Sequence, residues 1–425
     1  MKKLGLSFFP AFDWAISATH PEREERLLYT RDQLFEEGID DLDYIKIIKP
    51  KIIREEDVKR VHFILPNLLS HSHLVAAGSA YEVYRSFQDK EIEKGFALVR
   101  PPGHHAHKVV YGDRGFCIIN VGAVAIEKIR ANYGPLKIAI VDSDAHHGDG
   151  TEDIYYNDKN TLLISIHQDG RTLYPGSGSI ENFGGPSAYG YNINIPLPPE
   201  TGESGFLFVM KEIVMPILSE FQPDIIINSA GQDNHYSDPL TNMNFTAQGY
   251  AKLNSILNPD LAILEGGYSV ETALPYINLG IVLAMAGEDY SQVIEPDFQD
   301  YKTAQSEDVT EYIKRLSDII MDNWKNKDKL ALKKFGNKSE IIEKKRIYYD
   351  TSQILENQTR TYHLCHCGGY EKFSSISDSD VSIKGIYLPQ LACKKCHAEA
   401  LNLYQKSVAD FVFFQDRVND KVFEK

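Results

Sequence analysis

Short apolar runs recur along the first 290 residues and alternate with longer stretches of helical periodicity. The runs occupy residues 96–99, 138–141, 162–166, 225–227 and 261–264. Continuous apolar runs of this length are typical of strands that are buried on both faces. Stretches between them, such as 73–87 and 206–221, predict helices. The alternation predicts an α/β fold with a mostly parallel sheet flanked by helices.

Polar residues follow each of the five predicted strands. They include 100–105 after the first strand, 142–149 after the second, 167–169 after the third, 231–238 after the fourth and 265–268 after the fifth. In parallel α/β sheets, ligands bind outside the carboxyl ends of the strands. We therefore expect these polar groups to converge on one site at that rim.

The second predicted strand ends in the densest group of polar side chains. This group comprises Asp142, Asp144, His146, His147 and Asp149. Carboxylates and imidazoles are costly to gather beside a buried strand unless a cation or a proton relay holds them together. Asp144 and His146 are two residues apart, so both side chains leave the same face of an extended chain. The spacing predicts two ligands of one catalytic metal ion.

A catalytic zinc ion usually has three protein ligands and one open position for water. Asp238 is the best candidate for the third ligand, and Asp233 is its rival because it lies closer to the strand. An Asp-Pro pair such as 238–239 also commonly starts a turn. Spacing alone leaves both aspartates open.

The adjacent residues His104 and His105 lie on a loop at the end of the first predicted strand. Two histidines that face a metal site are interpreted as a proton-handling pair, and solvated surface histidines are the alternative. Asp142 and Asp149 could fix the tautomers of such a pair. Tyr268 could place its hydroxyl beside a substrate carbonyl, or it could be an ordinary core tyrosine.

Composition and charge restrict the class of protein. The 425 residues are 43% hydrophobic and 25% charged, as expected for a soluble globular chain with one large domain and a smaller one. The net charge of −15 argues against nucleic-acid or anionic-membrane binding and is compatible with cationic substrates. The absence of an export signal and of a membrane-length apolar run predicts a cytoplasmic protein, and a homo-oligomer remains open.

The last third of the chain has a different pattern. We expect a catalytic domain over 1–300, a helical linker with a solvated basic face over 301–360, a metal-binding module over 361–404 and a helical tail over 405–425. The module contains Cys365, Cys367, Cys393 and Cys396. Four thiolates suit a structural zinc ion in a small zinc-ribbon-like module. A variant that uses His363 or His366 remains open, as do free cysteines.

Several motifs carry a resemblance to a known family. They are Arg-Pro-Pro-Gly-His-His-Ala at 100–106, Gly-Phe-Cys at 115–117, Val-Asp-Ser-Asp-Ala-His-His-Gly-Asp-Gly at 141–150, Tyr-Pro-Gly-Ser-Gly at 174–178, Ser-Ala-Gly-Gln-Asp at 229–233, Asp-Pro-Leu at 238–240 and Glu-Gly-Gly-Tyr at 265–268. Over about residues 1–290 the chain resembles the zinc-dependent histone deacetylase superfamily, which includes acetylpolyamine amidohydrolases and acetoin-utilisation proteins. The details are closer to its class II-like bacterial branch. The resemblance implies an arginase–deacetylase fold.

The resemblance also implies roles for site residues. Zinc would be held by Asp144, His146 and Asp238. His105, paired with Asp149, would act as general base and then as general acid, and His104, paired with Asp142, would be its electrostatic partner. Tyr268 would donate a hydrogen bond to the oxyanion. The substrate would contact Gly115, Phe116, Tyr174 and Leu240. A structural K⁺ ion would use Asp142, Asp144, His146, Ser165 and Ile166, and a second one would lie near Tyr155, Asp158 and Thr161.

The function implied is that of a zinc-dependent deacetylase, a hydrolase that removes acetyl or other acyl groups from lysine side chains or polyamines. The alternative is a catalytically weak acyl-lysine reader or scaffold that acts through the C-terminal zinc module. A manganese ureohydrolase would need a two-metal cluster, which the histidine pair and Tyr268 disfavour. Leu240 stands where a polyamine-selective branch has glutamate, and 66–69 lacks the Tyr-Asp pair of many protein deacetylases. The choice of substrate therefore remains open.

Overall fold

An eight-stranded parallel sheet forms the centre of the molecule. The computed structural model describes residues 2–17, 19–296 and 298–425. The strand order is β2-β1-β4-β10-β9-β6-β7-β8, and every neighbouring pair is parallel. The strands are β1 (Leu4–Phe9), β2 (Ile45–Ile47), β4 (Lys94–Val99), β6 (Ile138–Asp142), β7 (Thr161–Gln168), β8 (Asn192–Leu197), β9 (Ile225–Ala230) and β10 (Leu261–Leu264). The five predicted strands are confirmed as β4, β6, β7, β9 and β10.

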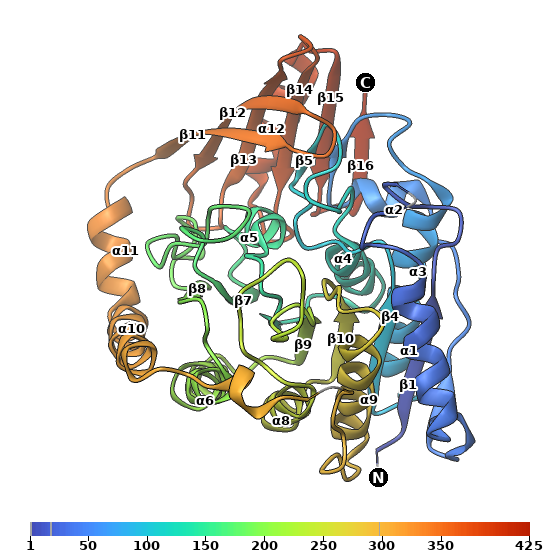
Figure 1. The fold of residues 1–425 in the computed structure, drawn as a ribbon. Helices are drawn as coiled ribbons and strands as arrows, with labels where there is room; N and C mark the ends of the chain where they lie inside the picture. The colour runs from blue at the N-terminus through green and yellow to red at the C-terminus, as the bar shows by residue number, and fades with distance from the viewer. Residues whose placement is uncertain (1, 18, 297) are drawn as a thin grey trace.

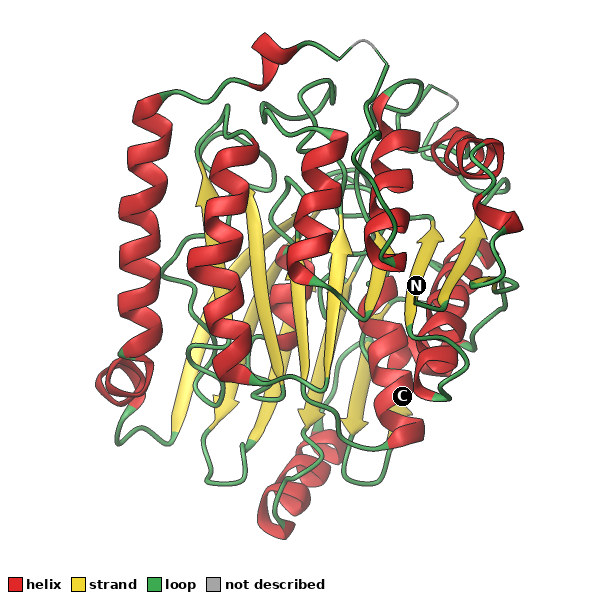
Figure 2. Cartoon of the chain, turned by 90° about the horizontal axis from the view of Figure 1, so that it is seen from below, coloured by secondary structure: helices red, strands yellow, loops and turns green. Residues whose placement is uncertain are grey.

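Helices cover both faces of this sheet (Figures 1 and 2). One hydrophobic core packs against α1 (Glu25–Glu36), α6 (Glu203–Val209), a π-helical turn (Met210–Val214), α7 (Met215–Phe221), α8 (Ala247–Leu257) and α9 (Ala273–Ala286). The other core packs against α2 (Glu55–Lys59), α3 (His71–Gln88), α4 (Val121–Tyr133) and α5 (Asp149–Tyr155). Short elements complete this part: 3₁₀ turns at Ile39–Asp41 and Asp300–Thr303, and a two-stranded parallel pair of β3 (Phe63–Ile64) and β5 (Val109–Val110). The mostly parallel, helix-flanked sheet predicted from the sequence is confirmed.

Polar side chains cap two of the helices that pack on the sheet, α4 and α8. Asn120 accepts a hydrogen bond from Ala123 N at the start of α4, and Thr246 accepts one from Gly249 N at the start of α8. Such caps satisfy backbone N–H groups that have no partner inside the helix. Gly287, in the left-handed conformation, ends α9. Among the described residues, none of the helices combines the length and apolarity needed to cross a bilayer.

The C-terminal part contains a second sheet. After α10 (Glu307–Lys325) and α11 (Lys327–Phe335), six strands follow in the order β11-β12-β13-β14-β15-β16. They are β11 (Glu340–Tyr349), β12 (Ile354–His363), β13 (Tyr370–Ser377), β14 (Ser382–Leu388), β15 (Phe411–Asp416) and β16 (Lys421–Glu424). Neighbouring strands are antiparallel except β14 and β15, which are parallel and joined through α12 (Lys394–Lys406).

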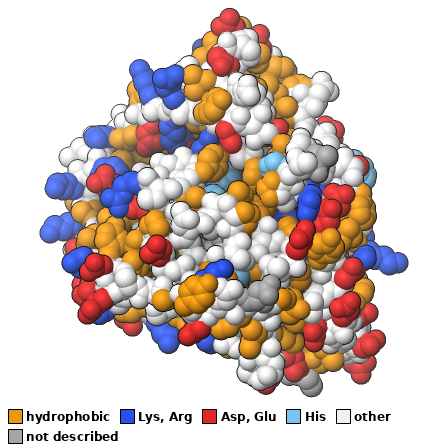
Figure 3. Space-filling view, viewed as in Figure 1, with side chains coloured by type: hydrophobic (Ala, Val, Ile, Leu, Met, Phe, Trp, Pro, Cys, Tyr) orange, Lys and Arg blue, Asp and Glu red, His pale blue; other side chains and the backbone are white. Residues whose placement is uncertain are grey.

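The helical prediction for 301–360 and 405–425 is therefore wrong in part. Helices cover 307–335, but 340–360 belongs mainly to β11 and β12, and the tail forms β15 and β16. The inward positions of β11 include Glu343 and Lys345 beside Ile347 and Tyr349. Because charged residues occupy both faces, the alternation of period two that marks a strand is hidden. Exposed lysines of this stretch lie on α10, α11 and β11. Figure 3 shows basic side chains gathered at the left, the side on which α11 lies in Figure 1.

The second sheet shares a hydrophobic core with the first part of the chain. Phe63 and Tyr111 pack with Ile347, Phe373 and other buried side chains of the sheet. A Cβ atom at Gly385 would overlap the ring of Phe63, so glycine is needed for this close approach. The sheet lies above α4 and α5 in Figure 1. The division into a catalytic domain and a separate zinc module stays a prediction.

Candidate active site

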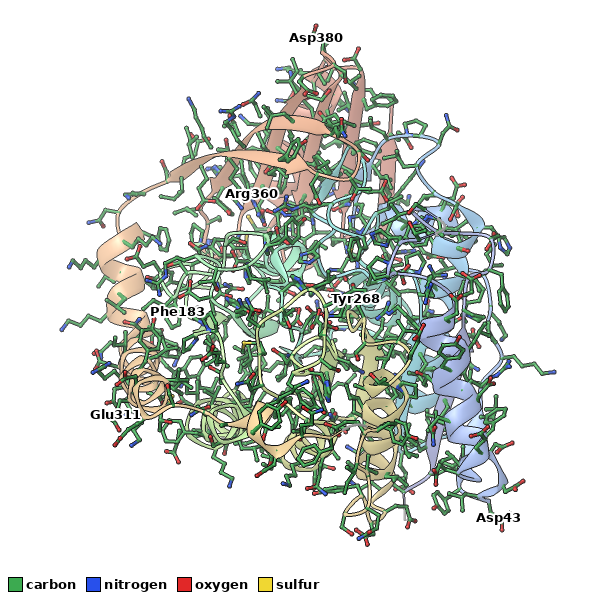
Figure 4. The ribbon with its side chains drawn as sticks, viewed as in Figure 1. Asp43, Phe183, Tyr268, Glu311, Arg360 and Asp380 are labelled. Carbon is green, nitrogen blue, oxygen red and sulfur yellow. The ribbon has the colours of Figure 1, made fainter. Side chains whose placement is uncertain are left out.

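The carboxyl ends of β4, β6, β9 and β10 meet at one rim, as the parallel order requires. A pocket of about 260 Å³ opens there, and Tyr268 lies in the middle of the view in Figure 4. Its walls are Pro102, His104, His105, Gly115, Phe116, Cys117, His146, Leu173, Tyr174, Leu240, Tyr268 and Asp350. All four predicted substrate-contacting residues line it. Asp350, from the C-terminal part, was not predicted.

A compact group of potential metal ligands lies at this rim. Ligand atoms of Asp144, His146 and Asp233 all lie within 4.8 Å of one another. The Nδ1 atom of His146 is 2.9 Å from Asp233 Oδ2 and 3.1 Å from Asp144 Oδ1. Asp238 is buried nearby but outside this group, and its two oxygens accept hydrogen bonds from Leu240 N and Tyr268 N at 2.9 and 2.7 Å. The structure therefore brings the rival ligand Asp233 next to the predicted pair.

The electrostatics of this group favour a cation. Burial and the negative charge of Asp233 raise the pKa of Asp238 to about 8. Burial and the charge of Asp144 likewise raise the pKa of Asp233. Burial opposes ionisation of Asp144 too, but the charge of His104 and the hydrogen bond from His146 hold its pKa well below the usual range. A bound cation would relieve the remaining repulsion among the three carboxylates. Carboxylate and imidazole donors in this arrangement suit a zinc ion.

The two adjacent histidines pair with the two predicted aspartates. His105 Nδ1 is 2.8 Å from Asp149 Oδ1, and His104 Nδ1 is 3.1 Å from Asp142 Oδ2. Burial and the neighbouring His104 lower the pKa of His105 to about 3. Burial also lowers the pKa of His104, but the negative charges of Asp144 and Asp142 outweigh the effect of burial. They hold the pKa of His104 well above the ordinary value. The environment thus gives the two rings different protonation states, which suits different roles.

Asp149 has two further partners that sequence reasoning missed. Its Oδ2 atom accepts hydrogen bonds from Arg114 Nε at 2.9 Å and from His107 Nε2 at 3.1 Å. Burial opposes ionisation of Asp149, but the charges of Arg114 and His107 and the His105 hydrogen bond hold its pKa well below the usual range. Arg114 precedes the Gly-Phe-Cys motif, but nothing in the local pattern indicated a contact with Asp149.

Tyr268 is anchored on both its backbone and its ring. Its N–H donates to Asp238, and the guanidinium of Arg26 lies 4.9 Å from the ring centroid. The Phe116 and Tyr268 rings are nearly perpendicular, and their centroids are 5.5 Å apart. Gly267 has φ +121°, a conformation that side chains rarely adopt, which explains the glycine before Tyr268. Burial holds the Tyr268 pKa well above its ordinary value, so the phenol stays a proton donor.

Glu265 positions the histidine loop. Its Oε2 atom accepts hydrogen bonds from Gly103 N at 2.8 Å and from His104 N at 3.1 Å, and Ser229 Oγ donates to Oε1 at 3.0 Å. Burial raises the Glu265 pKa to about 7, although the neighbouring His104 opposes the shift. This glutamate belongs to the Glu-Gly-Gly-Tyr motif, but the sequence pattern assigns it no role. Its contacts join the ends of β4, β9 and β10.

The residues of the predicted potassium sites have other partners. Ser165 Oγ lies 3.0 Å from His167 Nδ1. At the second site, Arg130 donates to Asp158 Oδ2 and Thr161 Oγ1, both at 2.9 Å. A guanidinium thus already balances the carboxylate of Asp158. Potassium binding stays a prediction.

The four C-terminal cysteines come together as the spacing predicts. Sγ atoms of Cys365, Cys367, Cys393 and Cys396 all lie within 4.8 Å of one another, and all four are free thiols. Burial opposes ionisation, but the backbone N–H groups near Cys393 and Gly369 lower the Cys367 pKa to about 7. A lowered thiol pKa favours the thiolate that binds metal. The group contains neither His363 nor His366.

Comparisons with known proteins agree with this geometry. The family model of the histone deacetylase domain matches residues 63–282. The chain is 44% identical over 311 residues to a probable deacetylase of Archaeoglobus fulgidus, covering 66% of this chain and 85% of that protein. It is 31% identical over 255 residues to a histone deacetylase-like amidohydrolase of Pseudomonas aeruginosa, covering 55% and 66% of the two chains.

A solved structure shares the fold. The crystal structure of the HDA15 HD domain matches with a TM-score of 0.65 and 26% identity, covering 79% of this chain and 99% of that chain. The fold match agrees with the parallel sheet and its rim, whereas the family model ends before the C-terminal sheet begins. The arginase–deacetylase fold expected from the motifs is confirmed. By sequence, fold and the residues at its rim, the chain belongs to the histone deacetylase superfamily.

Proposed function

We propose that the protein hydrolyses the amide bond of an acylated amine, either an acyl-lysine side chain or an acylated polyamine. One observation carries the proposal: a single pocket is lined by the paired histidines, by Tyr268 and by His146, whose ligand atom lies within 4.8 Å of those of Asp144 and Asp233. These are the groups that amide hydrolysis requires, namely a metal site, a proton acceptor and a donor to the carbonyl oxygen. The names of the relatives, deacetylase and amidohydrolase, support it.

A zinc ion would be held by Asp144, His146 and Asp238, with Asp233 beside them. The mutual repulsion of these buried carboxylates supports a bound cation. When bound, zinc lowers the pKa of water toward ~7 and polarises a carbonyl group. Comparing the zinc content of Asp238→Asn and Asp233→Asn identifies the third ligand, because replacing a ligand lowers zinc affinity more than replacing a neighbour.

The side chains of the pocket have separate tasks in this proposal. His105 is neutral and is held by Asp149. Its Nε2 atom accepts a proton from the attacking water molecule and later gives that proton to the leaving amine. His104, whose pKa is raised, supplies positive charge next to it. Tyr268 donates its phenolic hydrogen to the carbonyl oxygen as negative charge develops there. Phe116 and Tyr174 line the pocket, and their rings provide walls for an apolar amine stem.

The alternative of an acyl-lysine reader or scaffold has less support. A reader has no need of a proton acceptor, yet His105 has a carboxylate partner, Asp149, that orients its ring as proton transfer requires. The relatives from Archaeoglobus fulgidus and Pseudomonas aeruginosa are named for deacetylase and amidohydrolase activity, which is hydrolytic. Hydrolysis is therefore the function that the site supports best.

Release of acetate from acetyl-lysine peptides and from acetylated polyamines tests the proposal. We expect zinc-loaded protein to turn over at least one of these classes. Tyr268→Phe keeps the ring contacts but removes the donor, so kcat should fall by about 10²–10³. Tyr133→Phe, at an exposed position of α4, is the matched control. Absence of turnover on every acylated amine would overturn the proposal, as would full activity of Tyr268→Phe.

We also propose that the four C-terminal cysteines hold a second, structural zinc ion. Their thiols form a closed set of four soft donors, which suits a tetrahedral structural site. Metal analysis should find two zinc ions per chain in the wild type and one in Cys393→Ser. Cys117→Ala, which removes the remaining cysteine, should keep two. An unchanged zinc content in Cys393→Ser would contradict the proposal.

A further inference from the structure

The turn between β11 and β12 reaches the wall of the catalytic pocket. The Oδ1 atom of Asp350 accepts hydrogen bonds from Gly115 N at 2.8 Å and from the Tyr174 hydroxyl at 3.0 Å. Gly115 and Tyr174 both line the pocket, and so does Asp350 itself. A residue of the C-terminal sheet is therefore part of the wall of a site that the first 290 residues otherwise form.

The same turn is fixed by further contacts to residues 112–115. Thr351 Oγ1 donates to Gly115 O at 2.6 Å, and Asp113 N donates to Ser352 Oγ at 2.8 Å. A Cβ atom at Gly112 would overlap the side chain of Ser352. The fit is therefore close, and Asp350 has one defined position relative to the pocket. Such preorganisation lowers the cost of binding a ligand group there.

The charge of Asp350 faces a pocket that has no other carboxylate in its walls. Among the described lining residues, the others are apolar, aromatic, histidine or glycine. Oδ1 takes both wall contacts, and within the described part of the chain no hydrogen bond to Oδ2 is found. Arg114, on the same loop, hydrogen-bonds to Asp149 and to the Tyr348 carbonyl, and its positive charge also interacts with Asp350. What Asp350 offers a ligand is therefore its Oδ2 atom, which accepts no hydrogen bond from the described residues.

Position and exposure place this charge toward the outer end of the pocket. Asp350 is partly exposed, whereas His104, His105 and Tyr268 are buried. An acylated amine whose amide lies near the histidines extends its stem past Phe116 and Tyr174. A protonated amine on the remainder of the substrate would then meet a carboxylate. A partly buried carboxylate attracts an ammonium group more strongly than a fully solvated one does.

We propose that Asp350, carried by the turn of the C-terminal sheet, is a specificity-determining residue that selects acylated amines bearing a second, protonated amine. The inference rests on the proposed amide hydrolysis and adds a preference within it. It gives the C-terminal sheet a direct part in substrate choice. It also accounts for the contacts that hold the turn against Gly115 and Tyr174.

Two substrates of equal length test this preference. Nε-acetyl-lysinamide carries a free α-ammonium group, and 6-acetamidohexanamide lacks it but is otherwise matched. We expect the wild type to show a kcat/KM about three- to tenfold higher for the charged substrate, mainly through KM. In Asp350→Asn, which keeps an acceptor for Gly115 N, the ratio should fall to about one. A general structural defect would lower both values and leave their ratio unchanged.

Asp380→Asn is the matched control, because Asp380 is an exposed aspartate in the turn between β13 and β14 and does not line the pocket; it is labelled at the top of Figure 4. It should keep the wild-type ratio. A second measurement needs no variant: raising the salt concentration should reduce the wild-type ratio, since salt screens charges at a solvent-accessible site. A wild-type ratio of one, a ratio unaffected by salt, or an unchanged ratio in Asp350→Asn would overturn this inference alone. Turnover of neither substrate would overturn the proposed hydrolysis and this inference with it.

Discussion

The two sheets of this protein use polar residues in different ways. The strands of the eight-stranded parallel sheet are mainly apolar, and the residues of the candidate site lie at and just beyond their carboxyl ends, where the pocket lies. The six-stranded C-terminal sheet carries buried charged and polar groups in the middle of its strands, among them Glu356, Gln358, Arg360 and Glu371. The first sheet supports a site at its rim. The second packs beside that site through a shared hydrophobic core and through buried polar side chains.

This difference shows how the C-terminal sheet is attached. Arg360 of β12 donates to Glu371 at 2.8 Å within the sheet and to Asp153 at 3.2 Å on α5 (Figure 4). Lys345 of β11 also donates to Asp153, at 3.1 Å. Asp153 lies four residues after Asp149, the partner of His105. The residue that anchors the second sheet and the carboxylate partner of His105 therefore lie on the same short helix, α5.

Truncation tests whether the second sheet is a separate unit. A chain ending at Lys338 would expose Phe63, Val109 and Tyr111 and would leave Asp153 without Arg360. We expect it to lose cooperative thermal unfolding and to aggregate on size-exclusion chromatography, because a shared core is removed.

The matched truncation ends at Asp420 and removes only the edge strand β16, which is largely exposed. It should remain monodisperse and keep a cooperative transition. If the chain ending at Lys338 unfolds cooperatively at the wild-type temperature, the first part of the chain does not need the C-terminal sheet for stability. The two sheets would then belong to separate domains.

Arg360→Met tests the polar attachment on its own. Methionine keeps much of the side-chain length but leaves Glu371 as a buried charge without its main partner and leaves Asp153 with Lys345 alone from the C-terminal sheet. Breaking a buried pair by removing one partner costs about 3–5 kcal/mol, so the free energy of unfolding in urea should fall by that amount. Lys395→Met, which removes an exposed lysine 4.0 Å from Glu399, should change it by less than about 0.5 kcal/mol. Equal effects of the two variants would contradict the buried role of Arg360.

The sequence was sufficient for the parts of the fold that depend on local pattern. The strands β4, β6, β7, β9 and β10 are apolar runs, and the residues that follow them stand in the site because parallel strands end at one rim. The cysteines were predictable because two short pairs are typical of one metal site. Asp142 and Asp149 could be proposed as partners of His104 and His105 because all four follow predicted strands, but the assignment of each aspartate to one histidine came from the family resemblance.

The remaining features depend on contacts between distant positions. Asp350 and Gly115 are 235 residues apart, and no periodicity links them. Arg114 was missed because its partner Asp149 is reached through space. The sequence pattern of β11 and β12 suggested helix because charged residues such as Glu343 and Lys345 point inward, where Tyr362 and Asp153 contact them. Inward charges that are paired only in the folded protein leave no hydrophobic alternation in the sequence.

Gly112→Ala tests a close contact between the pocket loop and the turn of the C-terminal sheet. The added Cβ atom would overlap the Ser352 side chain near its backbone, so the turn carrying Asp350 must shift. Overpacking of this kind costs about 1–3 kcal/mol, which a urea titration can measure. Gly122→Ala is the matched control: its Cβ would have no neighbour closer than 3.7 Å, and within α4 alanine should stabilise the helix by about 0.5–1 kcal/mol. If Gly112→Ala lowers the free energy of unfolding and Gly122→Ala raises it, glycine is needed at 112 for the contact with the turn. A neutral Gly112→Ala would show instead that the turn adapts freely, and Asp350 would then have no fixed position at the pocket wall.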